Sequence, residues 1–174
     1  MMHPHHSPHE WLQRLLTLYE TGCGCFAWQF GLSARDWREV QVICGRPARL
    51  PTPETALRLH LMSELSATRR EEQEQLAHWL ATFMADGAAP MHHIVASTSL
   101  AYHHLWQDLG LDSRAELREL MSACFPELVA LNVQNMRWKK FFYRQRCLQN
   151  EGEIICLSPS CDECCEKSVC FAPG

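Results

Sequence analysis

The clearest structural signal in the sequence is the segment SPHEWLQRLLTLY, residues 7–19. Ser7 and Glu10 stand in the positions of a capping box, and Pro8 occupies the first helical position, where an N–H would have no intrahelical partner. Apolar side chains follow with helical spacing at Trp11, Leu12, Leu15, Leu16 and Tyr19. Because positions three and four apart share one face of a helix, the segment predicts an amphipathic helix that ends at Gly22.

Similar patterns recur along most of the chain. Start signals and apolar stripes predict further helices over residues 33–44, 52–65, 76–86, 90–104, 113–124 and 135–148. Alternation of apolar and polar residues is not sustained anywhere, and only residues 153–156 could form a short strand. We therefore expect an all-α, multi-helix domain over residues 1–150, followed by a cysteine-rich metal-cluster loop.

Composition limits the class of protein. The chain has 174 residues, of which 47% are hydrophobic and 21% charged, as expected for one globular domain with a sizeable core. A formal net charge of −4 argues against general nucleic-acid binding. No apolar run reaches the roughly 18 residues of a membrane span, and the first ten residues do not resemble a secretory signal. These features predict a cytoplasmic protein with neither nucleic acid nor membrane as partner.

The cysteines are distributed unevenly. Five of the ten fall in the last 19 residues, at Cys156, Cys161, Cys164, Cys165 and Cys170. Stable disulfides are rare in a reducing cytosol, so such a cluster usually indicates metal binding. Residues 151–174 also have few aliphatic side chains with which to build a core. We therefore expect residues 151–174 to form a separate cluster-binding tail that a metal centre orders.

The spacing within the tail is C-x4-C-x2-C-x5-C, formed by Cys156, Cys161, Cys164 and Cys170. Thiolates are soft ligands that suit iron–sulfur clusters, zinc and copper(I). The first three positions match the spacing of plant-type iron–sulfur proteins, although structural zinc sites use similar gaps. Spacing alone leaves an iron–sulfur centre, structural zinc, and disulfides or free thiols as alternatives. Cys165 could replace a ligand, assist cluster exchange or have no role.

Three segments together resemble the NifQ family of nitrogen-fixation proteins. They are HLWQDLGL at residues 104–111, MRWKKFFYRQ at residues 136–145, and the tail from Cys156 to Pro173. The resemblance implies a molybdenum–iron–sulfur carrier that supplies molybdenum for biosynthesis of the iron–molybdenum cofactor of nitrogenase. In that family the cargo is thought to be a cuboidal Mo–Fe–S cluster. Carried over by position, its ligands are Cys156, Cys161, Cys164 and Cys170.

The same resemblance implies the partners. They are the nitrogenase cofactor-assembly scaffold and the nitrogenase iron protein, with molybdate or another molybdenum source upstream. The chain is expected to bind and deliver, without turnover chemistry, and it carries no hydrolase nucleophile elbow, P-loop or dinucleotide fingerprint. A zinc-stabilised helical interaction module and an iron–sulfur electron carrier are the alternative functions.

Several other residues could contribute to metal handling. Arg137, Lys140 and Arg144 flank the aromatic face of the last predicted helix, where they would attract molybdate or form an ordinary solvated surface. His104 and Asp108 are four apart, so a helix would pair them either as an oriented metal ligand or as a structural hydrogen bond. The sequence does not decide whether His103 or His104 ligates metal. The Cys23–Gly24–Cys25 turn could hold a metal transiently, although an incidental pair is the simpler interpretation, and Cys147 is a further alternative ligand.

Overall fold

The computed structural model describes residues 5–149, and within this range the chain contains helices and no strand. The all-α prediction is therefore confirmed for the described part. The elements are α1 (Pro8–Glu20), η1 (Trp28–Gly31), α2 (Ala34–Ile43), α3 (Pro53–Ala67), α4 (Arg70–Ala81), α5 (Met91–Thr98), α6 (Leu105–Asp108), α7 (Arg114–Cys124), α8 (Pro126–Leu131) and α9 (Trp138–Gln149). None of these helices combines the length and apolar character that crossing a lipid bilayer requires.

Local capping explains where several helices begin. Ser7 accepts a hydrogen bond from the backbone N–H of Glu10, whose carboxylate accepts one from the N–H of Ser7, so the predicted capping box is confirmed. Ser33, Thr52 and Ser113 cap α2, α3 and α7 in the same way through their hydroxyl groups. Each hydroxyl satisfies a backbone donor that the first helical turn leaves unpaired.

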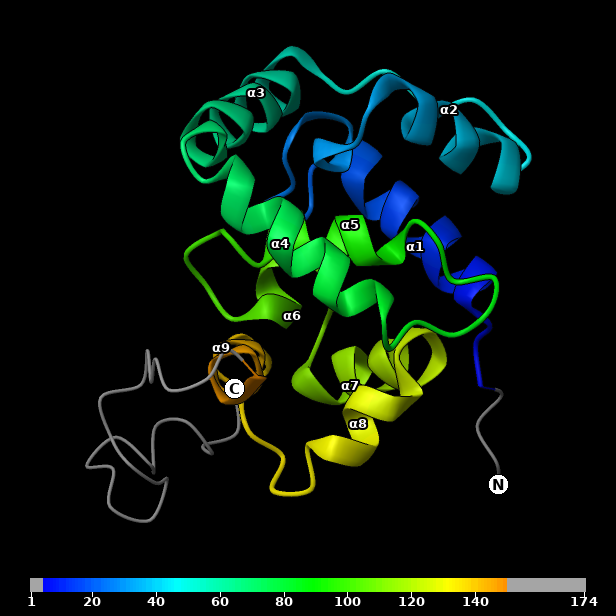
Figure 1. The fold of residues 1–174 in the computed structure, drawn as a ribbon. Coiled ribbons are helices and arrows are strands. Elements are labelled where there is room, and N and C mark those ends of the chain that lie inside the picture. The colour runs from blue at the N-terminus through cyan, green and yellow to red at the C-terminus, as the bar shows by residue number, and fades with distance from the viewer. Residues whose placement is uncertain (1–4, 150–174) are drawn as a thin grey trace.

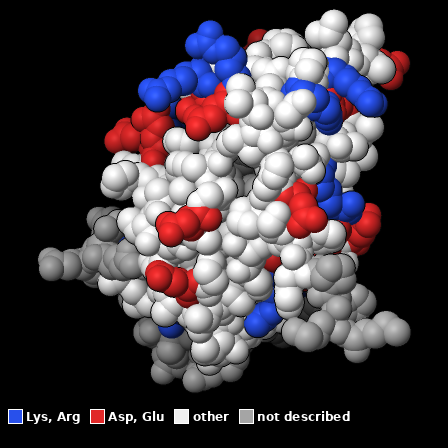
Figure 2. Space-filling view, turned by 90° about the vertical axis from the view of Figure 1, so that its right-hand side faces the viewer, with Lys and Arg blue, Asp and Glu red and all other residues white. Residues whose placement is uncertain are grey.

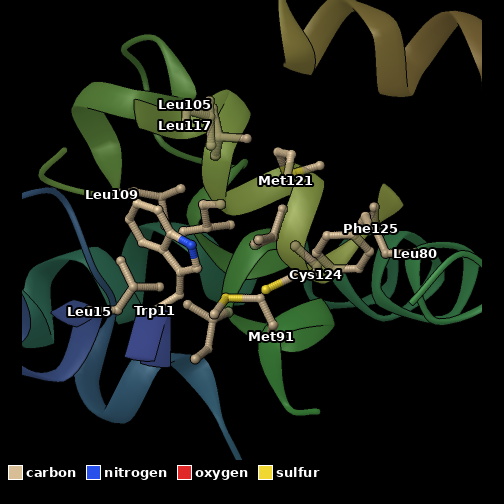
Figure 3. Close-up of a cluster of buried hydrophobic side chains, with 14 of the residues drawn as sticks. Trp11, Leu15, Leu80, Met91, Leu105, Leu109, Leu117, Met121, Cys124 and Phe125 are labelled. Carbon is tan, nitrogen blue, oxygen red and sulfur yellow. The ribbon is translucent and has the colours of Figure 1, made fainter. Parts of the chain in front are cut away.

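The hydrophobic core lies where α1, α5 and α7 meet. The apolar stripe of α1 is buried, and α7 packs against α1 while α4 packs against α5. Figure 3 shows Trp11 and Leu15 of α1 facing Leu117, Met121 and Cys124 of α7. Together with the buried residues of α4, α5 and α6, they form a single cluster. Burial of this kind, rather than helix propensity, supplies most of the stability of the helices.

The helix predicted over residues 90–104 is shorter than expected. It ends at Thr98, and a turn leads to the four-residue helix α6. The hydroxyl groups of Thr98 and Ser99 donate to the carbonyls of Ile94 and Val95, which places polar side chains back on the last turn of α5. Such local bonds compete with continued helix formation. Residues 99–104 are therefore free to change direction toward α9.

Three further helices differ from the sequence-based prediction. The helix expected over residues 76–86 is α4, which begins earlier, at Arg70, and ends at Ala81. Pro126 begins a separate helix, α8, because proline is favoured at the first helical position as well as after a helix end. The last helix starts at Trp138 instead of residue 135. Asn135 adopts a left-handed conformation (φ 52°), and the side chain of Asn132 bonds both the N–H and the carbonyl of Met136. This turn directs α9 across the end of α6, where Figure 1 shows it end-on.

Residues 1–4 and 150–174 lie outside the described range. The four predicted cluster ligands Cys156, Cys161, Cys164 and Cys170 fall there, as do Cys165 and the possible strand at residues 153–156. The boundary between a domain at residues 1–150 and a tail at residues 151–174 therefore stays a prediction, as does the role of Cys147.

Candidate functional site

Chemically reactive side chains gather where the start of α9 crosses α6. We call this region the α6–α9 corner; it comprises residues 23–25, 102–108 and 137–140, together with Arg114. Asp108 lies at its centre with none of its surface exposed. The Asp108 Oδ2 atom accepts a hydrogen bond from Lys139 Nζ at 2.6 Å, and Lys139 also donates to the carbonyl of Ala101 at 2.7 Å. Lys139 thereby holds α9 against α6 and the turn before it.

The other carboxylate oxygen of Asp108 faces two potential metal ligands. The Oδ1 atom lies 3.3 Å from Nδ1 of His103, and that nitrogen lies 3.8 Å from Sγ of Cys25. One ligand atom from each of these three residues lies within 4.8 Å of the other two. Oδ1 is buried, and its contact with His103 is an ion pair only when the imidazole is protonated; by geometry it makes no hydrogen bond within the described residues. A sulfur, a nitrogen and an oxygen ligand thus converge on one point.

Two glycines bring Cys25 to this point from the distant end of α1. The N–H of Cys25 donates to the carbonyl of Asp108 at 2.7 Å. Gly24 (φ +76°) lies so close to α6 that a Cβ atom would approach the Asp108 carbonyl oxygen to 2.5 Å, and Gly110 (φ +73°) faces it across the contact. Only glycine accommodates both the left-handed backbone and this approach. The tight turn expected at Gly24 is present, and it allows the loop that carries Cys25 to pack against the end of α6.

The two cysteines of this turn do not act as a pair. Cys23 is exposed and accepts a hydrogen bond from the Thr21 hydroxyl group at 3.6 Å, whereas Cys25 is half-buried beside His103. Burial raises the pKa of the Cys25 thiol, and the Asp108 carboxylate raises it further. The proton therefore stays on this sulfur at neutral pH unless a cation displaces it.

The histidine that faces Asp108 is His103 and not His104. α6 begins at Leu105, so His104 is its N-cap with an extended backbone (ψ 148°), and the i,i+4 relation of a continuous helix does not apply. The N–H of His104 donates instead to the side chain of Gln107. The sequence-based prediction missed that His104 is an N-cap. His103, which precedes the N-cap, can therefore fold back over the first turn of α6.

A cavity of 430 Å³ opens beside these residues. Its lining consists of Tyr102, His103, His104, Leu105, Trp106, Gln107, Arg114, Leu117, Arg137, Trp138, Lys139 and Lys140. Four of these residues are cationic and none is acidic. On the face shown in Figure 2, by contrast, basic and acidic side chains are mixed. Of the predicted basic flank, Arg137 and Lys140 line the cavity and Arg144 does not.

The electrostatics of the cavity favour an anion. Burial lowers the pKa of His104, and the positive charges of Arg137 and Lys139 lower it further. Burial also lowers the pKa of Arg114, with added repulsion from Arg137 and Arg118. Asp108 balances Lys139, but the cavity lining itself supplies no carboxylate. A bound oxyanion would relieve this repulsion and accept charge-assisted hydrogen bonds.

Three buried donors on residues that line the cavity also have no partner in the described part of the chain. They are Nε of Arg137 and the indole N–H groups of Trp106 and Trp138. Buried polar atoms are almost always hydrogen-bonded in folded proteins, so an unpaired set beside a cationic cavity indicates a ligand or ordered water. The α6–α9 corner can therefore hold a cation at Cys25 and Asp108 and an anion beside Arg137.

The sequence comparisons agree with the motif-based resemblance. The NifQ family model matches residues 11–172. Protein NifQ of Klebsiella pneumoniae is 59% identical over 164 residues, covering 94% of this chain and 98% of that protein. Protein NifQ of Azotobacter vinelandii is 36% identical over 182 residues, covering 94% and 87%. No solved structure is significantly similar to the chain.

Proposed function

Because the chain belongs to the NifQ family, which relates it to nitrogen fixation, we propose that it is a molybdenum–iron–sulfur carrier. It supplies molybdenum for biosynthesis of the nitrogenase iron–molybdenum cofactor. Its cargo is a cuboidal cluster held by Cys156, Cys161, Cys164 and Cys170. It acts in the cytoplasm as a donor and not as an enzyme, delivering molybdenum to the cofactor-assembly scaffold together with the nitrogenase iron protein.

One observation carries this proposal: a family member ends in four cysteines with the spacing C-x4-C-x2-C-x5-C. Four thiolates within 15 residues suit an inorganic cluster, since closing such short loops costs little entropy. A compact array of soft thiolate ligands therefore fits a cluster cargo.

The cationic cavity supports the same proposal from the substrate side. Molybdate is a tetrahedral dianion, and Arg137, Lys140 and Arg114 offer positive charge in a partly enclosed space. The cavity lies at the start of α9, and Cys156 follows the last residue of that helix, Gln149, by seven positions (156 − 149). The chain therefore combines an oxyanion-attracting surface with a thiolate array in one continuous segment.

Metal analysis of protein isolated without oxygen tests the proposal. We expect brown protein that contains both molybdenum and iron, and we expect Cys161→Ser or Cys164→Ser to lose the metals and the colour. The helical circular dichroism should persist, because the core is built from residues 5–149. Cys23→Ser is the matched control, since Cys23 is exposed and lies outside the tail. Colourless protein that contains zinc would support the interaction-module alternative instead.

A second experiment tests delivery. Cells that depend on molybdenum nitrogenase should lose nitrogenase activity at limiting molybdate when they carry Cys161→Ser, and excess molybdate should restore it. An iron–sulfur electron carrier would not be bypassed by molybdate. Activity that is unchanged at limiting molybdate would contradict the carrier role.

A further inference from the structure

We propose that Cys25, His103 and Asp108 form a binding site for one divalent first-row transition-metal ion, distinct from the cysteine tail. The three residues come from the loop after α1, the turn after α5 and the end of α6, and they meet only in the folded chain. The site concerns residues that the proposed carrier function does not use. It therefore stands or fails independently of that function.

The distances match those between ligands of a tetrahedral metal ion. Metal–sulfur and metal–nitrogen bonds of about 2.3 and 2.05 Å at tetrahedral angles place the sulfur and nitrogen atoms about 3.6 Å apart, and the nitrogen and oxygen atoms about 3.4 Å apart. The observed separations are 3.8 Å for Cys25 Sγ to His103 Nδ1 and 3.3 Å for His103 Nδ1 to Asp108 Oδ1. The sulfur of Cys25 and a carboxylate oxygen of Asp108 lie within 4.8 Å of each other. An ion could enter after small shifts of these side chains, leaving a fourth position for water.

The buried Oδ1 atom of Asp108 also points to a ligand, because its 3.3 Å contact with His103 Nδ1 does not have hydrogen-bond geometry. Asp108 is fully buried, and Lys139 satisfies only its Oδ2 atom. A buried carboxylate oxygen without a hydrogen bond is costly, so folded proteins rarely retain one without a function. A cation bound at Oδ1 would remove this cost.

The donor set selects the class of metal. Magnesium and calcium require oxygen ligands, whereas a thiolate with an imidazole and a carboxylate suits zinc, iron(II) and cobalt(II). When the ion binds, the Cys25 thiol transfers its proton to solvent as the metal–sulfur bond forms. Two anionic ligands then balance the charge of the ion, and Lys139 remains paired with Oδ2.

The arrangement does not suit a nucleophilic Cys–His–Asp triad. In such a triad the cysteine and the carboxylate contact different nitrogens of the imidazole, so that a proton can pass through the ring. Here both Cys25 Sγ and Asp108 Oδ1 approach Nδ1 of His103. Convergence on a single nitrogen is the geometry of shared coordination.

Cobalt(II) titration of the full-length chain tests the site. To exclude the tail, the six cysteines from Cys147 to Cys170 are replaced by serine in the parent protein. We expect one equivalent of cobalt to bind with sulfur-to-cobalt charge-transfer absorption in the near ultraviolet, and zinc to displace it. Cobalt held by the N-terminal histidines would lack that absorption.

Variants with matched neighbours then assign the ligands. Cys25→Ser should abolish the charge-transfer band, and His103→Gln should weaken cobalt binding at least about tenfold. Cys23→Ser and His104→Gln, which alter the adjacent residues of the same types, should bind like the parent. Asp108→Asn is assayed only if its circular dichroism equals that of the parent. Absence of saturable binding, or equal effects of the test and control variants, would overturn the proposal.

Discussion

The helical core and the α6–α9 corner differ in burial as well as in composition, because the corner surrounds the buried Asp108 with exposed side chains such as Tyr102 and His103. The core around Leu15, Leu16 and Ile94 is apolar, and these residues are fully buried. The corner buries the carboxylate of Asp108, which pairs with Lys139 through Oδ2 and faces His103 through Oδ1. Of the seven buried side-chain polar atoms without a partner in residues 5–149, four belong to corner residues, namely Trp106, Asp108, Arg137 and Trp138. The core therefore accounts for stability, whereas the corner retains unsatisfied groups that a ligand could satisfy.

The largest expected effect tests the ion pair of the corner. Lys139→Met removes the ammonium group that lies 2.6 Å from the fully buried Asp108 carboxylate and should lower the free energy of unfolding by about 3–5 kcal/mol. Urea denaturation followed by circular dichroism measures this change. Lys140→Met is the control, because Lys140 is exposed and makes no such contact in the described structure. Equal stability of the two variants would show that the Asp108 charge is not buried in solution.

A slightly smaller effect is expected in the core. Leu16→Ala removes a fully buried side chain from α1 and should destabilise the protein by about 2–5 kcal/mol through lost burial and the cavity left behind. Val133→Ala, at a side chain that is 84% exposed, should change stability by less than about 0.5 kcal/mol. At temperatures where the Leu16→Ala protein is folded, it should bind cobalt like the parent. This result would show that core stability and metal binding in the corner are independent.

The sequence predicted the core much better than it predicted the corner. Helix boundaries at Ser7, Ser33 and Ser113 follow from contacts within three or four residues, so local patterns reveal them. The family motifs also include Asp108 and Lys139. The contacts around Asp108 are not local. Cys25 and His103 lie 78 positions apart in the sequence, and no periodic pattern connects them. Only the folded backbone shows that Cys25, and not Cys23, faces α6.

The choice of His103 over His104 illustrates the same limit. A helix continued through residue 104 would have paired His104 with Asp108, which is what the spacing suggested. The early end of α5 at Thr98 and the restart at Leu105 move the backbone by a turn, and the neighbouring imidazole takes that position. A small error in a helix boundary thus changes which residue belongs to a site, even when the fold class is predicted correctly.

The docking of the Cys25 loop can be tested with two glycines that differ only in their surroundings. Gly24 and Gly87 both have left-handed backbones (φ +76° and +77°), but a Cβ atom would collide with α6 at Gly24 and meet open space at Gly87. Gly24→Ala should therefore cost about 2 kcal/mol more than Gly87→Ala in urea denaturation. It should also weaken cobalt binding, because Cys25 would move away from Asp108. Equal costs would place the loop away from α6.

The smallest expected effect concerns a polar exception near the core. Burial lowers the pKa of His92 on α5 to about 4, and the charge of His93 adds to this shift. In the unfolded chain the imidazole titrates near its ordinary pKa of about 6.5. Between these values the unfolded state binds more protons than the native state, so stability should decrease as the pH falls from about 6.5 toward about 4. The full shift corresponds to a loss of about 2 kcal/mol between pH 7 and pH 5. Because His92 is partly exposed, solvent screening should reduce this loss to about 1 kcal/mol.

Replacing the histidine isolates its contribution. His92→Gln should reduce the dependence of unfolding free energy on pH across that window, whereas His78→Gln, at an exposed position on α4, should leave it unchanged. The corner gives the same sign for its ligand: cobalt binding should also strengthen as the pH rises, because the Cys25 thiol must lose its proton. If both variants retained the full pH dependence of stability, His92 would be hydrated in solution. The core would then contain a hydrated polar side chain on α5, and its contrast with the ligand-binding corner would not hold there.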